Sequence, residues 1–288
     1  MITKADLEYT SRLFCEAGKE LFNEDFRGYH NLYLERRLNY FATRYGVDKG
    51  SRLIDMLINQ PGIIHELKKE LNIGYTAFYR DPSFFTRMTE LIRRKAESQK
   101  TVHIWHAGCS KGHEVISLLI LLEEAGLVSK CKIYATDINT KNLNQAEKGI
   151  IPIEDLQAGV KPYLAAGGNE HLGNYFNIAG QHAILRHKLI KKVKFGIHDL
   201  SKDAPFQKFD IILCRNVFIY YQPFFQKKLL SCIVASMKKE SYLGLSPSEN
   251  IEESGEALGL ICFDRHLNIY KSGNSCKEES KNVKLPQL

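Results

Sequence analysis

The chain has 288 residues, of which 44% are hydrophobic and 25% are charged, and its formal net charge at pH 7 is +7. Its longest apolar run, residues 116–122, is far shorter than the ~20 residues of a membrane-spanning helix, and its first residues lack a signal-peptide pattern. We therefore expect a cytoplasmic protein without direct membrane insertion. Seven cysteines without a C-x-x-C pair predict free thiols and no metal site.

The first 71 residues predict a small all-helical domain of three or four helices. Apolar residues such as Leu34, Leu38 and Phe41 recur at helical spacing, and no strand-like alternation interrupts them. Three arginines of this segment fit either a basic face for an acidic partner or simple solvation: Arg36, Arg37 and Arg44.

An aromatic stretch, residues 71–85, follows the helices and contains Arg80 directly before Asp81-Pro82. A proline disfavours helical backbone in the residue before it, so a new helix is expected from Ser83. The planar guanidinium of Arg80 suits a carboxylate ligand, but an equally good interpretation is a structural ion pair.

Residues 102–122 predict a strand, a tight small-residue loop and a helix. Gly108 and Gly112 in the loop allow unusual backbone angles and close approach to a ligand. A second strand, residues 131–136, ends at Asp137, where a carboxylate is placed to bind the two hydroxyls of a ribose. The glycine pattern is not G-x-G-x-x-G, so taken alone it also fits an ordinary strand-to-helix turn.

The remaining chain predicts further strands and helices of the same sheet. Residues 151–175 are loop-rich, and short antiparallel strands with basic faces are expected between 175 and 195. The other predicted elements are a helix at 143–149, a strand at 193–197 ending in His198-Asp199-Leu200, a buried strand at 209–214 followed by Arg215-Asn216, a helix at 224–237, and strands at 242–245 and 263–270.

Alternating strands and helices predict an α/β fold with a Rossmann-like, doubly wound sheet. Ligands bind such sheets at the carboxyl ends of their strands. The 108–114 loop, Asp137, Asp199 and Arg215-Asn216 all follow strands. They should therefore outline one nucleoside site.

Five segments together resemble the CheR family of chemoreceptor glutamate methyltransferases. They are Thr76–Arg80, similar to T-x-F-[FY]-R; Trp105–Glu114, similar to W-[SN]-A-x-x-[ST]-G-E-E; Thr136–Asn139, similar to [SA]-[ST]-D-[IL]-[DN]; Phe209–Tyr220, similar to F-D-x-I-x-C-R-N-V-x-I-Y; and Ser248–Asn250, similar to S-E-[NS].

The resemblance implies a class I methyltransferase that uses S-adenosylmethionine (AdoMet) and releases S-adenosylhomocysteine (AdoHcy). It implies a helical domain at 1–71, an AdoMet-binding domain at 72–272 with a small β-subdomain inserted at about 176–192, and a disordered tail at 273–288. The cofactor-binding residues would be Thr76, Arg80, Gly108, Glu114, Asp137, Asp199, Leu200, Arg215 and Asn216.

Each of these residues would have a specific role under the resemblance. Asp137 would hold the ribose, Glu114 and Thr76 the amino-acid end, and Asp199-Leu200 would lie beside the adenine. Two residues would be catalytic, facing the transferred methyl group and the substrate carboxylate: Arg80 and Tyr220.

Three departures from the family pattern bear on cofactor affinity. Asn is common at the positions of Gly74 and Asp199, and the family usually has Glu-Glu-Pro-Tyr where this chain has His113-Glu114-Val115-Ile116. The substrate implied is the cytoplasmic helical domain of a chemoreceptor. The segment Gly180–Lys188 is short, so no tether to a receptor's C-terminal pentapeptide is expected.

Other interpretations remain open at this stage. They are a methyltransferase acting on another acceptor, and a non-catalytic module that binds AdoMet or AdoHcy. The lysines of residues 186–194 have no aromatic residues interleaved, so no nucleic-acid partner is expected. We expect a monomer.

Overall fold

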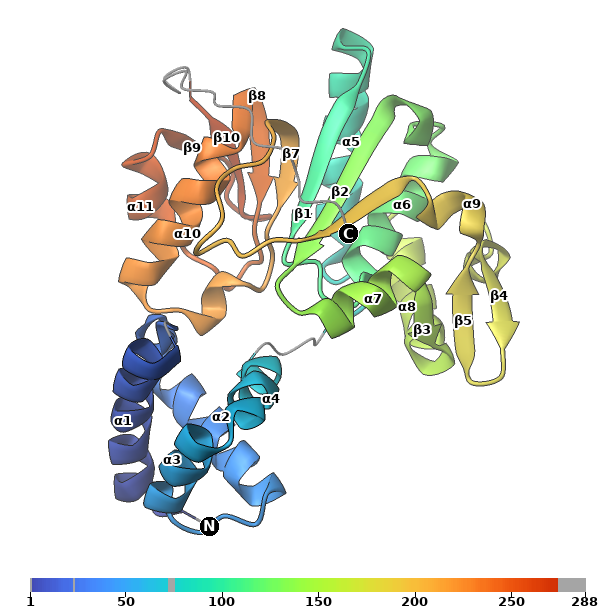
Figure 1. The fold of residues 1–288 in the computed structure, drawn as a ribbon. Coiled ribbons are helices and arrows are strands. Elements are labelled where there is room, and N and C mark those ends of the chain that lie inside the picture. The colour runs from blue at the N-terminus through green and yellow to red at the C-terminus, as the bar shows by residue number, and fades with distance from the viewer. Residues whose placement is uncertain (1, 23, 72–75, 274–288) are drawn as a thin grey trace. The chain divides into compact units, whose positions relative to one another are not determined.

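The computed structural model describes residues 2–22, 24–71 and 76–273 (Figure 1). The chain divides into two compact units, Met1–Ile73 with Phe218–Lys227, and Gly74–Val217 with Lys228–Leu288. The division predicted between residues 71 and 72 stays a prediction. Residues 274–288 of the predicted tail lie outside the described residues.

The first unit is helical, as predicted. Its helices are α1 (Lys4–Phe22), α2 (Asn31–Arg44), α3 (Gly50–Asn59) and α4 (Pro61–Leu71), with a short 3-10 turn η1 (Phe26–Gly28) between α1 and α2. The apolar residues that recur at helical spacing form its core, in which Leu38, Phe41 and Leu53 are fully buried.

The segment Phe218–Lys227 belongs to this first unit although it is distant in sequence. It contains the 3-10 turn η4 (Phe218–Tyr220) and the start of helix α10 (Pro223–Ala235). The carbonyl of Tyr220 accepts a 2.9 Å hydrogen bond from the His30 N–H, and the ring of Tyr220 packs on Tyr33 with centroids 4.9 Å apart. Tyr220 is therefore anchored to the N-terminal helices.

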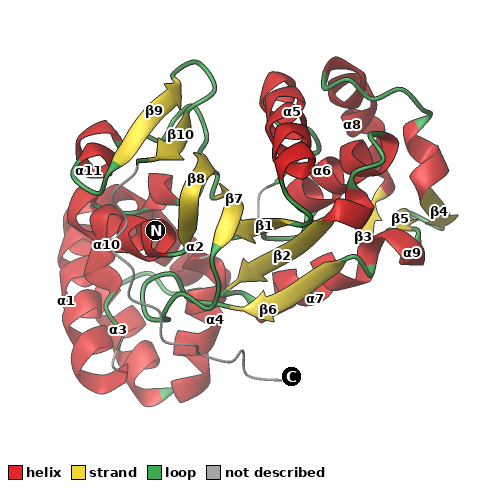
Figure 2. Cartoon of the chain, turned by 90° about the horizontal axis from the view of Figure 1, so that it is seen from above, coloured by secondary structure: helices red, strands yellow, loops and turns green. Residues whose placement is uncertain are grey.

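A seven-stranded sheet organises the second unit, in the order β6-β2-β1-β7-β8-β10-β9 (Figure 2). The first five strands of this order pair in parallel, and β10 pairs antiparallel with both β8 and β9. The strands are β1 (Val102–Ala107), β2 (Cys131–Asp137), β6 (Val193–Ile197), β7 (Phe209–Leu213), β8 (Met237–Gly244), β9 (Leu260–Asp264) and β10 (Ile269–Ser272). The predicted doubly wound α/β fold is confirmed.

Helix α5 of the second unit precedes β1, and the other helices of this unit lie between strands. The helices are α5 (Pro82–Ser98), α6 (His113–Glu124), α7 (Thr140–Lys148), α8 (Ile153–Ala165), α9 (His187–Ile190) and α11 (Glu252–Glu256), with 3-10 turns η2 (Val128–Lys130) and η3 (Leu172–Tyr175). Helix α6 is apolar over most of its length and buried from Val115 to Leu122, as expected of a central helix. The Trp105 ring of β1 packs instead on Phe206 and Phe209, and its indole N–H donates to the Thr136 hydroxyl at 2.9 Å.

A separate three-stranded antiparallel sheet supplies the small β-subdomain. Its order is β3-β5-β4, from β3 (Ile150–Pro152), β5 (His182–Leu185) and β4 (Phe176–Ala179). The sequence predicted the hairpin of β4 and β5 but not β3, which enters the sheet from upstream of the proposed insertion.

Two stretches differ from the sequence prediction. Helix α8 forms where Gly159 and Pro162 had suggested a loop. Pro162 lies in the last turns of the helix. Gly159 packs against Phe78, and a Cβ at this position would lie 2.8 Å from the Phe78 Cβ. The stretch predicted as one strand over 263–270 instead contains the end of β9, a turn at 265–268 and the start of β10. Within the turn, Asn268 adopts a positive φ of 54°.

The lysine-rich stretch between β5 and β6 also differs from the prediction. It forms the short helix α9 rather than a strand, and β6 then joins the main sheet in parallel. Within the described part of the chain, no helix is long and apolar enough to cross a membrane.

Candidate active site

The loop after β1 is closed by backbone contacts to the end of β2. The N–H groups of Gly108 and Cys109 both donate to the Thr136 carbonyl, at 2.8 and 2.9 Å. Gly108 has a φ of +77°, and a Cβ there would lie 2.7 Å from a methyl carbon of Val217. Only glycine fits such a position without strain, so the loop backbone packs closely against Val217 at the strand ends.

Gly112 directly precedes helix α6, and its position also excludes a side chain. Its φ is +86°, and a Cβ would approach the Cβ of Ala146 on α7 to 2.9 Å. No side chain caps the N-terminus of α6. The first N–H groups of a helix attract negatively polarised ligand atoms, so this end suits a ligand that carries acceptor oxygens.

Asp137 lies at the end of β2 with its carboxylate held by two loops. One oxygen accepts from the Ser110 N–H at 2.7 Å and the other from the Asn139 N–H at 2.8 Å. Burial raises the pKa of Asp137 above its usual range, and these two N–H donors partly oppose the rise. The carboxylate is thus short of solvent and suited to accept hydrogen bonds from a diol.

Glu114, in the first turn of α6, is flanked by the His106 imidazole and the Arg215 guanidinium. One oxygen lies 3.1 Å from Nδ1 of His106 on β1, and the other accepts from Arg215 at 3.3 Å. Burial favours a higher pKa for Glu114, but the hydrogen bond of His106 and the charge of Arg215 outweigh it and lower the pKa. Glu114 is therefore an ionised carboxylate at neutral pH.

Arg215 follows β7 and is a buried structural cation. Besides Glu114 it binds the Asp81 carboxylate and the Arg80 carbonyl, the latter at 3.1 Å, and it stacks on Phe84 at 4.1 Å from the ring centroid. Arg215 therefore fixes the segment that carries Arg80 against the strand end.

The side chain of Arg80 differs from that of Arg215 in its exposure and in its contacts. Residue Arg80 is exposed, and no hydrogen bond or ion pair of its guanidinium occurs among the described residues. The sequence allowed Arg80 to be either a ligand contact or a member of a structural ion pair. In the structure the ion pairs are formed by Arg215 instead.

Glu249, on the loop after β8, positions Asn216. Its carboxylate accepts from the N–H groups of Asn216 at 3.0 Å, Val217 at 2.8 Å and Ser246 at 2.8 Å. Asn216 has a positive φ of 61°, which this triple contact stabilises. The sequence motif included Glu249, but sequence reasoning gave it no role, and it missed His106 altogether.

Asp199 and Leu200 follow β6 beside Asp137, because the His198 N–H reaches the Asp137 carbonyl at 3.3 Å. The Asp199 carboxylate accepts from both the N–H and the hydroxyl of Ser201, at 2.8 and 2.6 Å. It therefore holds its own turn in place.

Some of the predicted site residues lie together at the carboxyl edge of the sheet, and others are not tied to it by a contact. Glu114 and Arg215 bind each other directly. Gly108, Asp137 and Asn216 lie at the same strand ends through contacts with neighbouring residues, namely Thr136, Ser110 and Glu249. Thr76 and Leu200 are half-buried, without a contact that ties their side chains to this set, and Tyr220 belongs to the first unit.

Two of the three family departures can be located. His113 is buried, with Nε2 2.9 Å from the Asp155 carboxylate and its ring against Phe78, so it faces the core. Asp199 holds the turn described above. Gly74 lies outside the described residues.

The residues at this edge fit the nucleoside and amino-acid groups of AdoMet. Among the described residues, the buried Ser110 hydroxyl, the Asn216 amide nitrogen and Nε2 of His106 have no hydrogen-bond partner, and native proteins rarely leave such atoms unsatisfied. Asp137 suits a ribose, and Glu114 an ammonium group. No cluster of metal-ligating side chains occurs within the described ranges.

Comparison with known proteins identifies the family of the chain. The family model for the CheR methyltransferase SAM-binding domain matches residues 74–265. Chemotaxis protein methyltransferase 1 of Vibrio cholerae is 31% identical, with 87% of this chain and 91% of that protein covered. Cher3 of Pseudomonas putida, which carries a provisional methyltransferase name, is 30% identical, with 88% and 93% covered.

A solved structure, magnesium protoporphyrin IX methyltransferase of Synechocystis with bound SAM, is 13% identical. It covers 92% of this chain and 97% of that chain with a TM-score of 0.39, too low to add to the argument. The family model and the Vibrio relative suffice: the chain belongs to the CheR methyltransferase family, whose cofactor is AdoMet.

Proposed function

We propose that this protein is a cytoplasmic enzyme that transfers the methyl group of AdoMet to glutamate side chains of chemoreceptors. The products are glutamyl methyl esters and AdoHcy. The observation that carries the proposal is the pair of arginines at the strand ends. Arg215 is buried in ion pairs, whereas the exposed guanidinium of Arg80, carried on the same fixed segment, has no ion-pair partner among the described residues.

The chemistry requires orientation rather than acid–base catalysis. A glutamate side chain, with an ordinary pKa of about 4.3, is ionised at neutral pH. One carboxylate oxygen forms the new bond to the methyl carbon as the carbon–sulfur bond breaks, and no proton moves. Arg80 would hold the other carboxylate oxygen by charge-assisted hydrogen bonds. Alignment of this kind supplies up to ~7–11 kcal/mol of rate acceleration.

Direct transfer is favoured over a covalent cysteine intermediate. Two thiols lie near the strand ends, Cys109 and Cys214, and both are buried. Burial raises the pKa of each well above its ordinary value, so neither forms the reactive thiolate readily.

Tyr220 is proposed as a second contact to the substrate carboxylate, as a hydrogen-bond donor. This role rests on the resemblance to the family motif. The contacts with His30 and Tyr33 support it only in that they hold Tyr220 in a defined position within its own unit.

The test is incubation with methyl-labelled AdoMet and chemoreceptor cytoplasmic fragments from the same source. Label that base releases as volatile methanol would establish methyl esters. Base-stable label would refute carboxylate methylation, and no label with intact AdoHcy binding by calorimetry would favour a non-catalytic module.

Arg80→Ala separates substrate orientation from cofactor binding. We expect methyl transfer to be lost while AdoHcy binding is retained. Arg265→Ala, which removes an exposed arginine paired with Glu252, is the control and should leave both unchanged. Equal loss of transfer and AdoHcy binding in Arg80→Ala would contradict the proposed role.

A further inference from the structure

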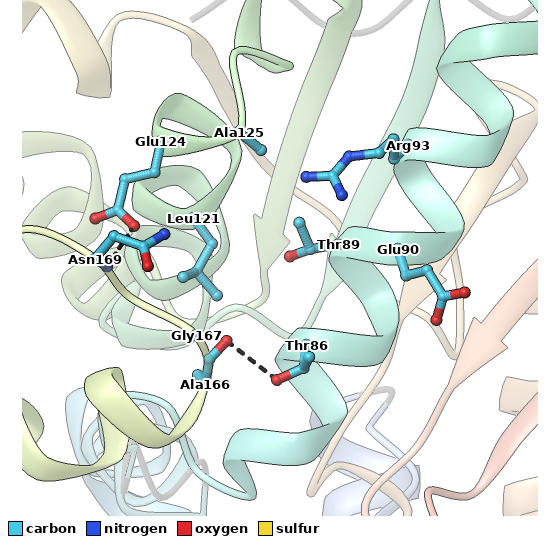
Figure 3. Close-up of a pocket in the computed structure, with 10 residues that line it drawn as sticks. All are labelled: Thr86, Thr89, Glu90, Arg93, Leu121, Glu124, Ala125, Ala166, Gly167 and Asn169. Carbon is cyan, nitrogen blue, oxygen red and sulfur yellow. Dashed lines mark hydrogen bonds between the residues drawn. The ribbon is translucent and has the colours of Figure 1, made fainter.

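A groove of about 380 Å³ lies between α5, α6 and the segment that follows α8 (Figure 3). Its walls include Arg93 of α5 and Glu124 at the end of α6. Glu124 is ten residues beyond Glu114, or about 15 Å along the helix axis. The groove is therefore separate from the AdoMet site.

One wall carries an exposed arginine, Arg93. Arg93 extends from α5 toward the end of α6 (Figure 3), and no acidic partner of Arg93 occurs among the described residues. The neighbouring arginines differ. Arg87 and Arg94 both bind the carboxylate of Glu90, Arg87 at 2.5 Å, and this lowers the pKa of Glu90. The negative charge of Glu90 is thus already compensated by these two arginines.

The opposite wall carries a fixed anion. Glu124 accepts hydrogen bonds from the hydroxyls of Tyr163 and Tyr175 through one oxygen, and from the Asn169 N–H at 3.0 Å through the other. Burial, followed by the hydrogen bond to Glu124, raises the pKa of Tyr163 to about 12. The tyrosine therefore remains a donor at neutral pH, and Glu124 keeps a defined orientation.

Between the two charges lie an unsatisfied hydroxyl and an apolar surface. The hydroxyl oxygen of Thr89 is buried, and no described group forms a hydrogen bond with it. Such an atom usually has a water or ligand partner. Leu121 and Ala125 of α6 add apolar side chains to the lining.

We propose that this groove binds a small zwitterion, whose anionic group contacts Arg93 and whose cationic group contacts Glu124. The volume is near the lower end for ligand pockets, so it fits a molecule of amino-acid size. The Thr89 hydroxyl would donate to the anionic group, and the carbon chain would lie against Leu121 and Ala125.

The test uses compounds that share a four-carbon chain: 4-aminobutyrate, butyrate and butylamine. Calorimetric titration of the whole chain, saturated with AdoHcy to keep the AdoMet site filled, should give saturable binding of 4-aminobutyrate and at least about tenfold weaker binding of the singly charged compounds. Glycine, 3-aminopropanoate and 5-aminopentanoate then define the preferred charge separation. Equal binding of butyrate and 4-aminobutyrate, or no saturable binding of any zwitterion in the series, would refute the proposal.

Two variants assign the contacts. Arg93→Ala should weaken zwitterion binding about tenfold or more, and Thr89→Val, which keeps the side-chain shape, should weaken it by a smaller factor. Arg12→Ala is the control, because it removes an exposed arginine of α1 that pairs with Glu8 and does not line the groove. Equal effects of Arg93→Ala and Arg12→Ala would overturn the proposal. AdoHcy affinity, measured on the same samples, reports separately on the AdoMet site.

Discussion

Glu249 is the strongest candidate for a residue that holds the active-site loop without touching the ligand. Its carboxylate accepts three backbone N–H groups, from Asn216, Val217 and Ser246, and it is only 3% exposed. In Glu249→Gln the amide keeps the side-chain shape but retains one acceptor oxygen. That oxygen can preserve the two contacts of Oε2, and the amide nitrogen then faces the Val217 N–H, donor to donor.

The magnitude follows from the lost contact. A hydrogen bond to a charged group contributes about 1.5–3 kcal/mol, and a buried donor left unpaired costs a similar amount. We expect Glu249→Gln to lower the free energy of unfolding by roughly 2–4 kcal/mol, and Tm by roughly 4–16 °C for a unit of about 200 residues. AdoHcy affinity should fall as well, because Asn216 loses its support.

Urea denaturation and AdoHcy calorimetry measure the two effects. Glu252→Gln is the control, since Glu252 pairs with Arg265 at 3.2 Å on the surface and such pairs contribute about 0–1 kcal/mol. Similar stability of the two variants would refute the reasoning that the Glu249 carboxylate clamps the loop.

Three further predictions concern the loop, the pH dependence and the partner surface. Gly112→Ala should destabilise the protein by more than the ~1–2 kcal/mol cost of a left-handed backbone, because its Cβ would also clash with Ala146. Gly126→Ala is the control for the backbone cost alone, since Gly126 has a φ of +67° and nothing within 4 Å of its Cβ position. Urea denaturation of both variants measures the difference. The lowered pKa of Glu114 means that its contribution to stability is present above the unfolded value of about 4.3 and is lost as pH falls through the folded value. Glu114→Gln should therefore flatten the acid limb of unfolding free energy against pH, and an unchanged limb would contradict this. Exposed basic residues between 186 and 194 should speed association with an acidic receptor, so their reversal to Glu should lower the methylation rate and its salt dependence; no change in either would exclude this surface.

The parallel sheet and the position of its ligand edge could be predicted from sequence. The short apolar runs that end in Gly108, Asp137 and Arg215 are local patterns. Parallel strands place their carboxyl ends at one edge, so the polar residues that follow them meet there whatever the details of packing. Asp137 and Glu114 were predicted for this reason, together with the family resemblance.

Tertiary structure alone decided which side chains share a contact. The sequence left Arg80 with two interpretations, and only the ion pairs of Arg215 with Asp81 and Glu114, 134 and 101 residues apart, show which arginine is structural. Helix α8 was missed because Gly159 and Pro162 are breakers locally, yet Gly159 is required by packing on Phe78. Contacts of this kind depend on how distant segments approach one another, and no local pattern of polarity or propensity encodes that distance.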